Sequence, residues 1–379
     1  MAKPKNTQPE EVVDANSVTK NLLKGLLEKN ESDHYNFVPD NPTRVSMESL
    51  FLDAEIVLTE GIHRFTGSAG GGKTSQAIVV IKNFLADDPK RKALWVKAEG
   101  RLSQNMMMRS GVKFVFQPED WEYGTCFVLE SNTFEFICEL IDTSLKTFNE
   151  QGVKLGIVID SVDGLKLKSD ANNALGSERT MGPQLIMKRF LIRESYNITK
   201  FGAVCICISQ VTATMQDKGD APKLTSGGGG NALLHWSNYI LEFSPRWWGD
   251  NILQDGPNTK YHPEKNPIIG HLATITIKKS DRENENTKIQ YPIKHGRENG
   301  NSIWIEHELI TFLRKWGMID TKGAWLSFTP ALIKDAEEAL STTLEPKHQG
   351  FNQLLTYLEN NPKLTEYLTK RIRTVERKS

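Results

Sequence analysis

Residues 65–84 read FTGSAGGGKTSQAIVVIKNF, which places four glycines and a lysine between a short apolar strand and a helical repeat. Gly67, Gly72, Lys73 and Thr74 fit the spacing G-x-x-x-x-G-K-[ST] of a phosphate-binding loop. Glycines there let backbone N–H groups converge on a β-phosphate, the lysine neutralises the β and γ oxygens, and the threonine hydroxyl ligates Mg²⁺. The alternative is a flexible glycine-rich turn, but chance rarely supplies the lysine and both flanking elements as well. The stretch therefore predicts a nucleotide-binding core.

The chain has 379 residues, of which 47 are Lys or Arg and 47 are Asp or Glu, so its formal charge is zero. Its length exceeds the roughly 100–200 residues of one domain, which favours a large domain with one or two small ones. Because the net charge is zero, a nucleic-acid partner would have to meet a local basic surface. The net charge by itself identifies no partner.

The cysteines and apolar runs bear on the compartment. Cys126, Cys138, Cys205 and Cys207 lie in apolar segments without paired metal spacing, so we expect reduced core residues of a cytosolic protein. Cys205 and Cys207 are two apart in a strand-like run and should share a face. The N-terminal stretch MAKPKNTQPEEVVDAN has no apolar signal segment, and no window approaches the ~18 apolar residues that span a bilayer. We expect neither secretion nor membrane insertion.

Strand-like and helix-like segments alternate from about residue 46 to residue 295. Helices are expected after the glycine loop, where Ala77, Ile78, Ile81 and Leu85 should point inward, and at residues 133–150 and 184–195. The order predicts an α/β fold with a mainly parallel central sheet covered by helices. Apolar strands are expected at residues 62–66, 93–98, 126–130, 155–160, 203–209 and 239–243, with an antiparallel edge at 271–278 and 288–294.

We expect three parts along the chain. Residues 1–45 are polar, with an amphipathic helix near residues 18–27 on a tether. Residues 46–295 form the core. Residues 296–379 form a small C-terminal domain, with two short helical segments around GAWLSF and NNP.

Three polar residues follow expected strands of this core. Asp160 ends the strand LGIVID, where its carboxylate could reach the water shell of Mg²⁺, although strand-terminal aspartates are often caps. Glu99 follows ALWVKA and could polarise an attacking water, or could be a solvated glutamate at a loop entrance. Gln210 follows AVCICIS and could contact a γ-phosphate, or could be an ordinary polar strand end.

Together these motifs resemble those of the RecA-type homologous-recombination ATPases, including the phage UvsX-like branch. The resemblance spans about residues 44–373, nearly the whole chain. A phosphate loop alone is shared by many NTPases, whereas the ordered set of motifs is more specific. That set is GSAGGGKTS, VKAEG, VIDSV, CICISQ, GGGGNAL, GAWLSF and LTYLENNPKLTEYLTKRIR.

The resemblance implies a RecA-like P-loop ATPase core with a short N-terminal helical segment and a small C-terminal α/β domain. It implies that Thr74, Asp160 and Ser161 support Mg²⁺, that Glu99 is the water-activating base, and that Gln210 couples the γ-phosphate to a DNA-binding loop. The catalytic residues that the resemblance implies are therefore Glu99, Gln210 and Lys73. The residues implied to bind ATP are Gly67, Ser68, Ala69, Gly70, Gly71, Gly72, Lys73, Thr74 and Ser75.

Two DNA-binding loops are implied, near residues 172–182 and 211–231. The second is a long Gly, Ser, Thr and Lys segment directly after Gln210, which suits an order–disorder element, although the glycine run could be a linker. Its lysines could make sequence-independent, salt-sensitive backbone contacts. The DNA-binding residues are Met181, Gly182, Arg193, Lys218, Lys223, Gly229, Gly230 and Asn231.

The sequence departs from the family in several places. The family completes its nucleotide site across a subunit interface with two basic residues; Lys278 and Lys279 are the candidates, in an ambiguous register. Near the adenine the chain offers Ser103 and Met106 in place of an acidic residue and an aromatic. The tail ends in TKRIRTVERKS and is not acidic. The insertion PRWWGDNILQDGPNTKYHPEKNP has no counterpart, and its tryptophans could stack on bases or pack locally.

The expected function is a strand-exchange recombinase that uses ATP and Mg²⁺, forms a helical homo-oligomeric filament on single-stranded DNA, and engages double-stranded DNA. No membrane is involved, single-strand-binding or mediator proteins are possible partners, and the expected compartment is a bacterial or phage-infected bacterial cytoplasm. One alternative is a ring-forming DNA helicase of the same fold. Another is an ATP-binding regulator without catalysis.

Overall fold

The structure, a computed structural model, describes residues 24–25, 42–99, 102–171, 183–213, 224–225, 230–256 and 259–376. Contacts divide the chain into two units, Met1–Asn41 and Pro42–Ser379, and the second unit is described here. Of the helix expected near residues 18–27, only Lys24 and Gly25 are described, and both are helical. The rest of that expectation lies outside the described residues.

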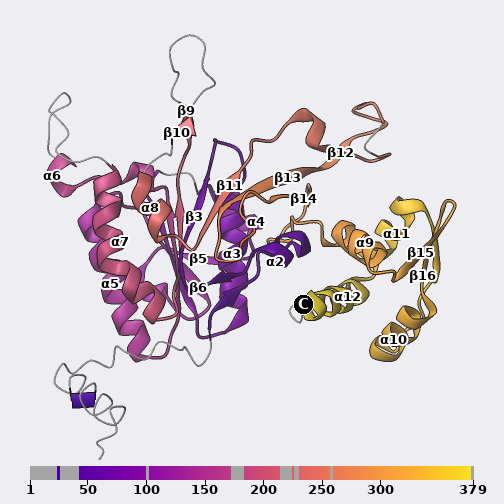
Figure 1. Ribbon diagram of the computed structural model, residues 1–379, viewed down its shortest axis with the longest axis horizontal. Coiled ribbons are helices and arrows are strands. Elements are labelled where there is room, and N and C mark those ends of the chain that lie inside the picture. Colours follow the sequence, from indigo (N-terminus) through magenta and orange to yellow (C-terminus); the bar gives the residue numbers. More distant parts are fainter. Residues whose placement is uncertain are drawn as a thin grey trace, which may run out of the picture. The chain divides into compact units, whose positions relative to one another are not determined.

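Figure 1 shows the helices and strands of the chain. The strands are β1 (Arg44–Val45), β2 (Leu58–Thr59), β3 (Gly61–Gly67), β4 (Lys92–Lys97), β5 (Lys113–Val115), β6 (Thr125–Leu129), β7 (Leu155–Asp160), β8 (Val204–Ile208), β9 (Thr212–Ala213), β10 (Leu224–Thr225), β11 (Tyr239–Phe243), β12 (Asn251–Leu253), β13 (Ile268–Lys279), β14 (Lys288–Lys294), β15 (Ile319–Lys322), β16 (Trp325–Phe328) and β17 (Lys347–Gln349). The helices are α2 (Leu50–Glu55), α3 (Lys73–Asp87), α4 (Gln104–Arg109), α5 (Phe134–Glu150), α6 (Lys168–Ala171), α7 (Pro183–Lys200), α8 (Gly230–Trp236), α9 (Ile305–Lys315), α10 (Pro330–Leu340), α11 (Gly350–Asn360) and α12 (Pro362–Glu376), with 3-10 turns η1 (Pro118–Asp120), η2 (Val162–Gly164) and η3 (Trp248–Asp250).

The central sheet has 10 strands among the described residues, in the order β12-β13-β11-β3-β8-β7-β4-β6-β5, with β14 also paired to β13. The strands from β11 to β5 pair in parallel, whereas β12, β13 and β14 pair antiparallel. The expected parallel sheet with an antiparallel edge is confirmed. The carboxyl ends of β3, β4, β7 and β8 meet at one edge, which is where ligands bind in open α/β sheets.

Helices cover both faces of this sheet (Figure 1). On one face, Trp95 of β4 and Val158 of β7 pack with α3. On the other, their sequence neighbours Leu94 and Ile157 pack with α5 and α7. Because successive strand residues point to opposite faces, a strand buried on both sides must be apolar throughout.

The cysteines behave as expected. All four are free and buried. Cys205 and Cys207 lie on the same side of β8, in the core that α5 and α7 share with the sheet. Burial raises the pKa of the Cys126 and Cys138 thiols. The chain thus keeps these thiols protonated and packed as small apolar groups.

Most expected elements of the core are confirmed within a few residues. The helix after the glycine loop is α3, and Ala77, Ile78, Ile81 and Leu85 are buried in it as expected. The helix expected at 184–195 is longer, since α7 spans Pro183–Lys200, and the strand expected at 271–278 begins earlier, as β13. The short elements α4, β5 and β12 were not expected.

The helical segment expected around GAWLSF is wrong. Trp325–Phe328 forms strand β16, which pairs with β15 on one side and β17 on the other. Leu326 and Phe328 are buried and Trp325 is exposed, which is the alternation of a strand. The NNP segment does lie between two helices, α11 and α12. The boundary expected after residue 295 remains a proposal.

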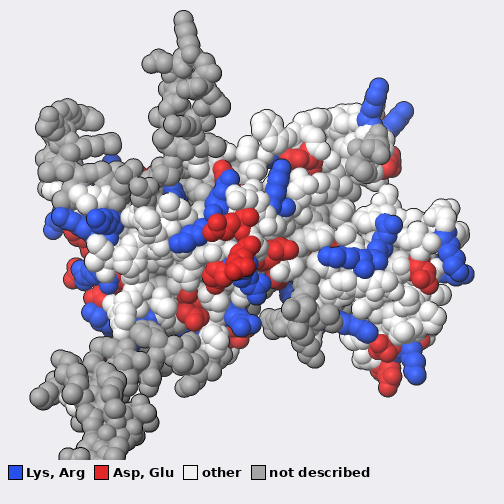
Figure 2. Space-filling view, in the orientation of Figure 1, with Lys and Arg blue, Asp and Glu red and all other residues white. Residues whose placement is uncertain are grey.

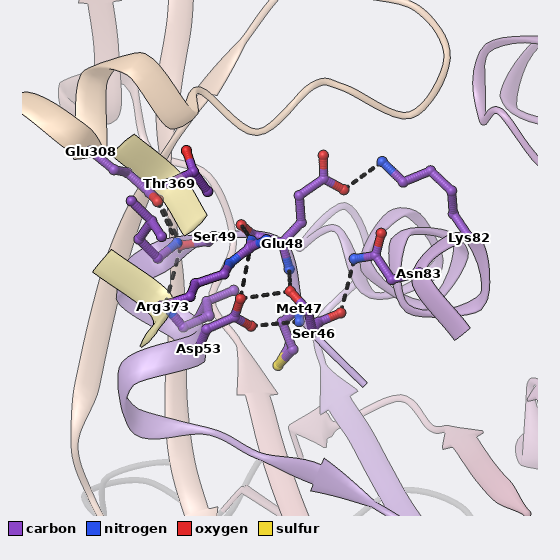
Figure 3. Close-up of polar contacts among 12 residues, drawn as sticks. Ser46, Met47, Glu48, Ser49, Asp53, Lys82, Asn83, Glu308, Thr369 and Arg373 are labelled. Atoms are coloured by element: carbon purple, nitrogen blue, oxygen red, sulfur yellow. Dashed lines mark hydrogen bonds and ion pairs between the residues drawn. The ribbon is translucent and has the colours of Figure 1, made fainter. Parts of the chain in front are cut away.

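The C-terminal helices and the first residues of the core share a polar junction, drawn in Figure 3. Glu308 of α9 accepts hydrogen bonds from the Ser49 hydroxyl and the Leu50 amide, both at 2.6 Å. Arg373 of α12 donates to the Glu48 carbonyl at 2.7 Å and pairs with Asp53 at 3.2 Å. The apolar cluster of α9, α11 and α12 also contains Leu50. Helix α2 is therefore fastened to the C-terminal helices by polar and apolar contacts.

Basic and acidic side chains are interspersed on the face that Figure 2 shows, among the described residues. This agrees with the zero formal charge of the sequence. No helix among the described residues has the length and apolar character needed to cross a bilayer.

Candidate nucleotide site

The glycine loop joins β3 to α3, and at two of its positions the structure requires glycine. At Gly67, φ is 137° and an added Cβ would lie 2.2 Å from the Phe243 carbonyl oxygen of the neighbouring strand β11. At Gly72, φ is 91° and the residue is the left-handed N-cap of α3. L side chains rarely adopt either conformation. The loop thus turns sharply and aims the N-terminus of α3 at the carboxyl edge of the sheet.

Lys73 is 5% exposed and donates to the carbonyl oxygens of Gly67 and Ser68, at 2.8 Å each. The Thr74 hydroxyl donates to Asp160 Oδ2 at 3.0 Å. The Lys73 ammonium and the Asp160 carboxylate, which are expected at a phosphate and metal site, therefore both lie beside the start of α3. This contact follows from the sheet order, in which β7 lies two strands from β3.

Four residues form a hydrogen-bonded group, which we call the Glu99 cluster: Glu99, Ser161, Asp163 and Gln210. The Ser161 hydroxyl donates to Glu99 Oε1 at 2.5 Å, and the Gln210 amide nitrogen Nε2 donates to Glu99 Oε2 at 3.2 Å. The Gln210 backbone N–H donates to Asp163 Oδ2 at 2.7 Å, while Ser161 Oγ lies 3.4 Å from the same oxygen. A hydroxyl has one proton, so Ser161 is committed mainly to Glu99. Sequence reasoning missed Asp163.

The structure thus brings Glu99 and Gln210 into direct contact. Both carboxylate oxygens of Glu99 are engaged, one by Ser161 and one by Gln210. The expected base and the expected sensor of a γ-phosphate are hydrogen-bonded partners in this state. A ligand that drew the Gln210 amide nitrogen away from Glu99 would break this hydrogen bond.

A cavity of ≈ 330 Å³ opens beside the loop. Its volume is in the range of small-molecule sites. Sequence reasoning missed most of this cavity, because its walls come from segments far apart in the chain. Those walls are Gly70, Gly71, Gly72, Ser75, Gln76 and Val79 of the loop and α3, Asn105, Met106 and Arg109 of α4, Arg246 and Asp250, and residues of β13 and β14 that include His271, Ala273, Tyr291 and Ile293.

His271, which lines the cavity, is paired with His295. His271 Nδ1 lies 2.9 Å from His295 Nε2. Burial, with Arg246 and His295 nearby, lowers the pKa of His271 to about 4. His271 is therefore neutral near pH 7. Met106 lines the cavity, and Ser103 is the N-cap of α4 and accepts from the Met106 amide. The expected place of these residues near an adenine remains a proposal.

The residues fit a bound nucleotide and Mg²⁺ on their own chemistry. Ser68 Oγ is buried and has no hydrogen-bond partner among the described residues, so the loop holds an orphaned polar atom. Mg²⁺ is usually held by one or two carboxylates together with substrate phosphates. Asp160 supplies one carboxylate and Thr74 a hydroxyl beside it, and within the described ranges no cluster of three His, Cys, Asp or Glu residues offers a protein-only metal site.

Lys278 and Lys279 have partners within the chain. Lys278 pairs with Glu242 of β11 at 2.8 Å. The Lys279 ammonium donates to the Leu234 and His235 carbonyl oxygens at the end of α8, at 2.9 and 3.0 Å. Their expected role across a subunit interface remains a proposal.

Of the expected DNA-binding residues, Arg193 is the one whose side chain is described. It lies on α7 and pairs with Asp142 at 3.3 Å and with Glu194 at 2.9 Å. Gly230 and Asn231 begin α8. Met181, Gly182, Lys218, Lys223 and Gly229 lie outside the described residues. The DNA contacts therefore remain proposals.

The tryptophans of the insertion do not pack into a core. Trp247 and Trp248 are 68% and 67% exposed, and Trp248 meets Tyr261 edge to face at 5.5 Å. Arg246 and Asp250, at the start of the insertion, line the cavity.

No protein-family model matches the chain. It is similar to RecA proteins over most of its length. It is 23% identical to Protein RecA of Thermotoga maritima over 310 residues, which are 81% of this chain and 74% of that protein. It is 22% identical to Protein RecA of Rickettsia bellii, covering 87% and 83%, and 25% identical to Protein RecA of Petrotoga mobilis, covering 88% and 81%. With the sheet order above, this confirms the expected fold class, a RecA-like P-loop core.

Proposed function

We propose that the chain is a DNA-dependent ATPase of the RecA type that assembles as a filament on single-stranded DNA and exchanges strands with a homologous duplex. The observation that carries this proposal is the convergence of five residues at one sheet edge. Lys73 and Thr74 begin α3, Asp160 ends β7, and Glu99 contacts Gln210. Similarity to RecA proteins over 81–88% of the chain supports the same class.

In this proposal each residue has a stated task. The loop amides and Lys73 hold phosphate oxygens, and Thr74 with Asp160 holds Mg²⁺. When bound, MgATP supplies a cleavable phosphoanhydride whose charge the metal partly neutralises. Glu99 accepts a proton from the attacking water once Gln210 no longer occupies its Oε2.

The DNA-binding part of the proposal rests on the two loops named from the sequence and on Gln210, which directly precedes the second one. Contacts from Lys218 and Lys223 to the DNA backbone would be salt-sensitive and independent of sequence. The N-terminal segment would dock on a neighbouring copy, and Lys278 or Lys279 would complete the neighbour's nucleotide site. A cytoplasmic location, and assistance from single-strand-binding or mediator proteins, belong to the same proposal.

The test is electron microscopy of the chain with single-stranded DNA and a non-hydrolysable ATP analogue. Helical filaments are expected. Closed rings would favour a helicase of the same fold, and free monomers would favour an ATP-binding regulator. Lys73→Ala should abolish nucleotide-dependent assembly, because the loop amides alone do not balance the phosphate charge. Assembly by Lys73→Ala equal to that of the wild type would show that the site is assigned wrongly.

A further inference from the structure

Asp163 occupies η2, the turn directly after β7. Its Oδ2 accepts the backbone N–H of Gln210 at 2.7 Å. Gln210 follows β8, the parallel neighbour of β7, with Asp160 opposite Ile208 in register. The Asp163 carboxylate therefore links the segment after β7 to the segment after β8, at the edge of the sheet where the candidate site lies.

A buried arginine on β3 holds the residue that precedes Gln210. Arg64 of β3 is 3% exposed, and its Nε donates to the Ser209 hydroxyl at 2.9 Å. Burial lowers the pKa of Arg64, and the charge of Asp163 acts in the opposite direction, so the two charges stabilise each other. Two consecutive residues, Ser209 and Gln210, are thus held through their hydroxyl and their backbone N–H.

The turn that carries Asp163 also packs against Glu99. A Cβ added at Gly164 would lie 2.7 Å from Glu99 Cγ and 3.1 Å from the Ala98 carbonyl oxygen. Ser161, at the other side of the turn, donates to Glu99. The turn residues 161–164 therefore contact both Glu99 and Gln210, and Asp163 is the member that fixes the Gln210 backbone.

We propose that Asp163 is a positioning residue: it fixes the backbone of Gln210 so that the amide of Gln210 can exchange between Glu99 and the nucleotide without the strand end moving. The inference rests on the proposed function, because it assigns Gln210 the task of sensing nucleotide. Without the anchor, the amide would sample many positions, and its preference for the ATP state over the ADP state would be averaged out. A ligand shifts an equilibrium only by its differential interaction with the two states.

The experiment compares the wild type with Asp163→Ala, Asp163→Asn, Gln210→Ala and the double variant Asp163→Ala/Gln210→Ala. The main readout is the ratio of single-stranded DNA affinities with a non-hydrolysable ATP analogue and with ADP. Steady-state kcat and KM for ATP are measured beside it. Asp335→Ala is the matched control, since it removes a carboxylate that pairs with Arg371 at 2.8 Å in the C-terminal helices.

Asp163→Ala should reduce the affinity ratio about tenfold, the worth of one hydrogen bond to a charged group. It should lower kcat while KM for ATP stays within about twofold. Asp163→Asn retains an oxygen that accepts the Gln210 N–H, so it should recover most of the ratio. In the Gln210→Ala background, Asp163→Ala should cause no further loss, because Asp163 acts through that side chain.

Additive losses in the double variant would overturn the inference, and so would an Asp163→Asn variant as impaired as Asp163→Ala. An unchanged ratio in Asp163→Ala would overturn it while leaving the proposed function intact. A wild type whose DNA affinity is equal with the analogue and with ADP would overturn both. If Asp163→Ala unfolds at a lower temperature than Asp335→Ala, its affinity ratio is set aside. The inference is then judged on Asp163→Asn, which should keep most of the wild-type ratio.

Discussion

Glu99 holds two partners from different strands, Ser161 after β7 and Gln210 after β8. The sequence predicted that Glu99 and Gln210 both follow apolar strands, and this is correct. It did not predict that they touch, because the contact depends on β7 pairing with β4 on one side and β8 on the other, an order that local periodicity does not reveal. Asp163 escaped notice for the same reason: its partner Gln210 lies on the following strand.

Glu99→Gln should keep nucleotide binding and slow turnover by about 10²–10⁴-fold, because an amide retains the shape but cannot accept the proton of a water. Nucleotide affinity by fluorescence titration and turnover by phosphate release check the two halves separately. Turnover near the wild-type rate would remove Glu99 from the mechanism.

Gly67→Ala should destabilise the folded chain by about 2–4 kcal/mol, because the new Cβ meets the Phe243 carbonyl oxygen at 2.2 Å and φ is 137°. Gly249→Ala is the matched control, since its Cβ meets nothing within 4 Å and its φ is not positive. Denaturant unfolding measures both. Equal stability of the two variants would contradict the close approach of the loop to β11.

At the scale of elements, long periodic segments could be predicted and short ones could not. Helix α5 shows apolar residues at helical spacing over 17 residues, and its expected bounds are nearly right. Strand β16 has 4 residues, too few to separate a strand from a helix by period, and its pairing with β15 and β17 decides its state. The cavity could not be predicted, because it needs α4 to face β13 and β14.

Helix α8 ends against Lys279, whose ammonium caps the carbonyl oxygens of Leu234 and His235. Cations at helix C-termini contribute a few tenths to about 1 kcal/mol. Lys279→Met should therefore speed amide exchange in α8 up to about fivefold through local opening. Lys278→Met is the control, because Lys278 pairs with Glu242 and should leave exchange in α8 unchanged. Equal exchange in the two variants would show that the cap adds nothing.

At the scale of the described unit, one buried carboxyl group ties the C-terminal helices to the core (Figure 3). Burial raises the pKa of Glu308 to about 8, and the hydrogen bonds from Ser49 and Leu50 only partly offset this. A raised pKa means that the folded chain binds the proton more tightly than the unfolded chain. The resulting stability is complete below the unfolded pKa of about 4.5 and is lost as the pH rises through about 8.

Glu308→Gln removes this titration while keeping one oxygen acceptor. The free energy of unfolding of the wild type, minus that of the variant, should therefore fall by a few kcal/mol between pH 5 and pH 8. Denaturant unfolding at both pH values gives the difference. A difference that is independent of pH would show that Glu308 does not bind a proton in the folded chain over this range.

Strand β13 has 12 residues, and at about 3.4 Å per residue it is about 40 Å long. Its first half lines the cavity beside the glycine loop at His271, and its last residue is Lys279 against α8. Strands pair with it on both sides, which gives it the bending stiffness of a sheet rather than of a single chain. One continuous strand therefore links the wall of the cavity, at His271, to the carboxyl end of α8, at Lys279.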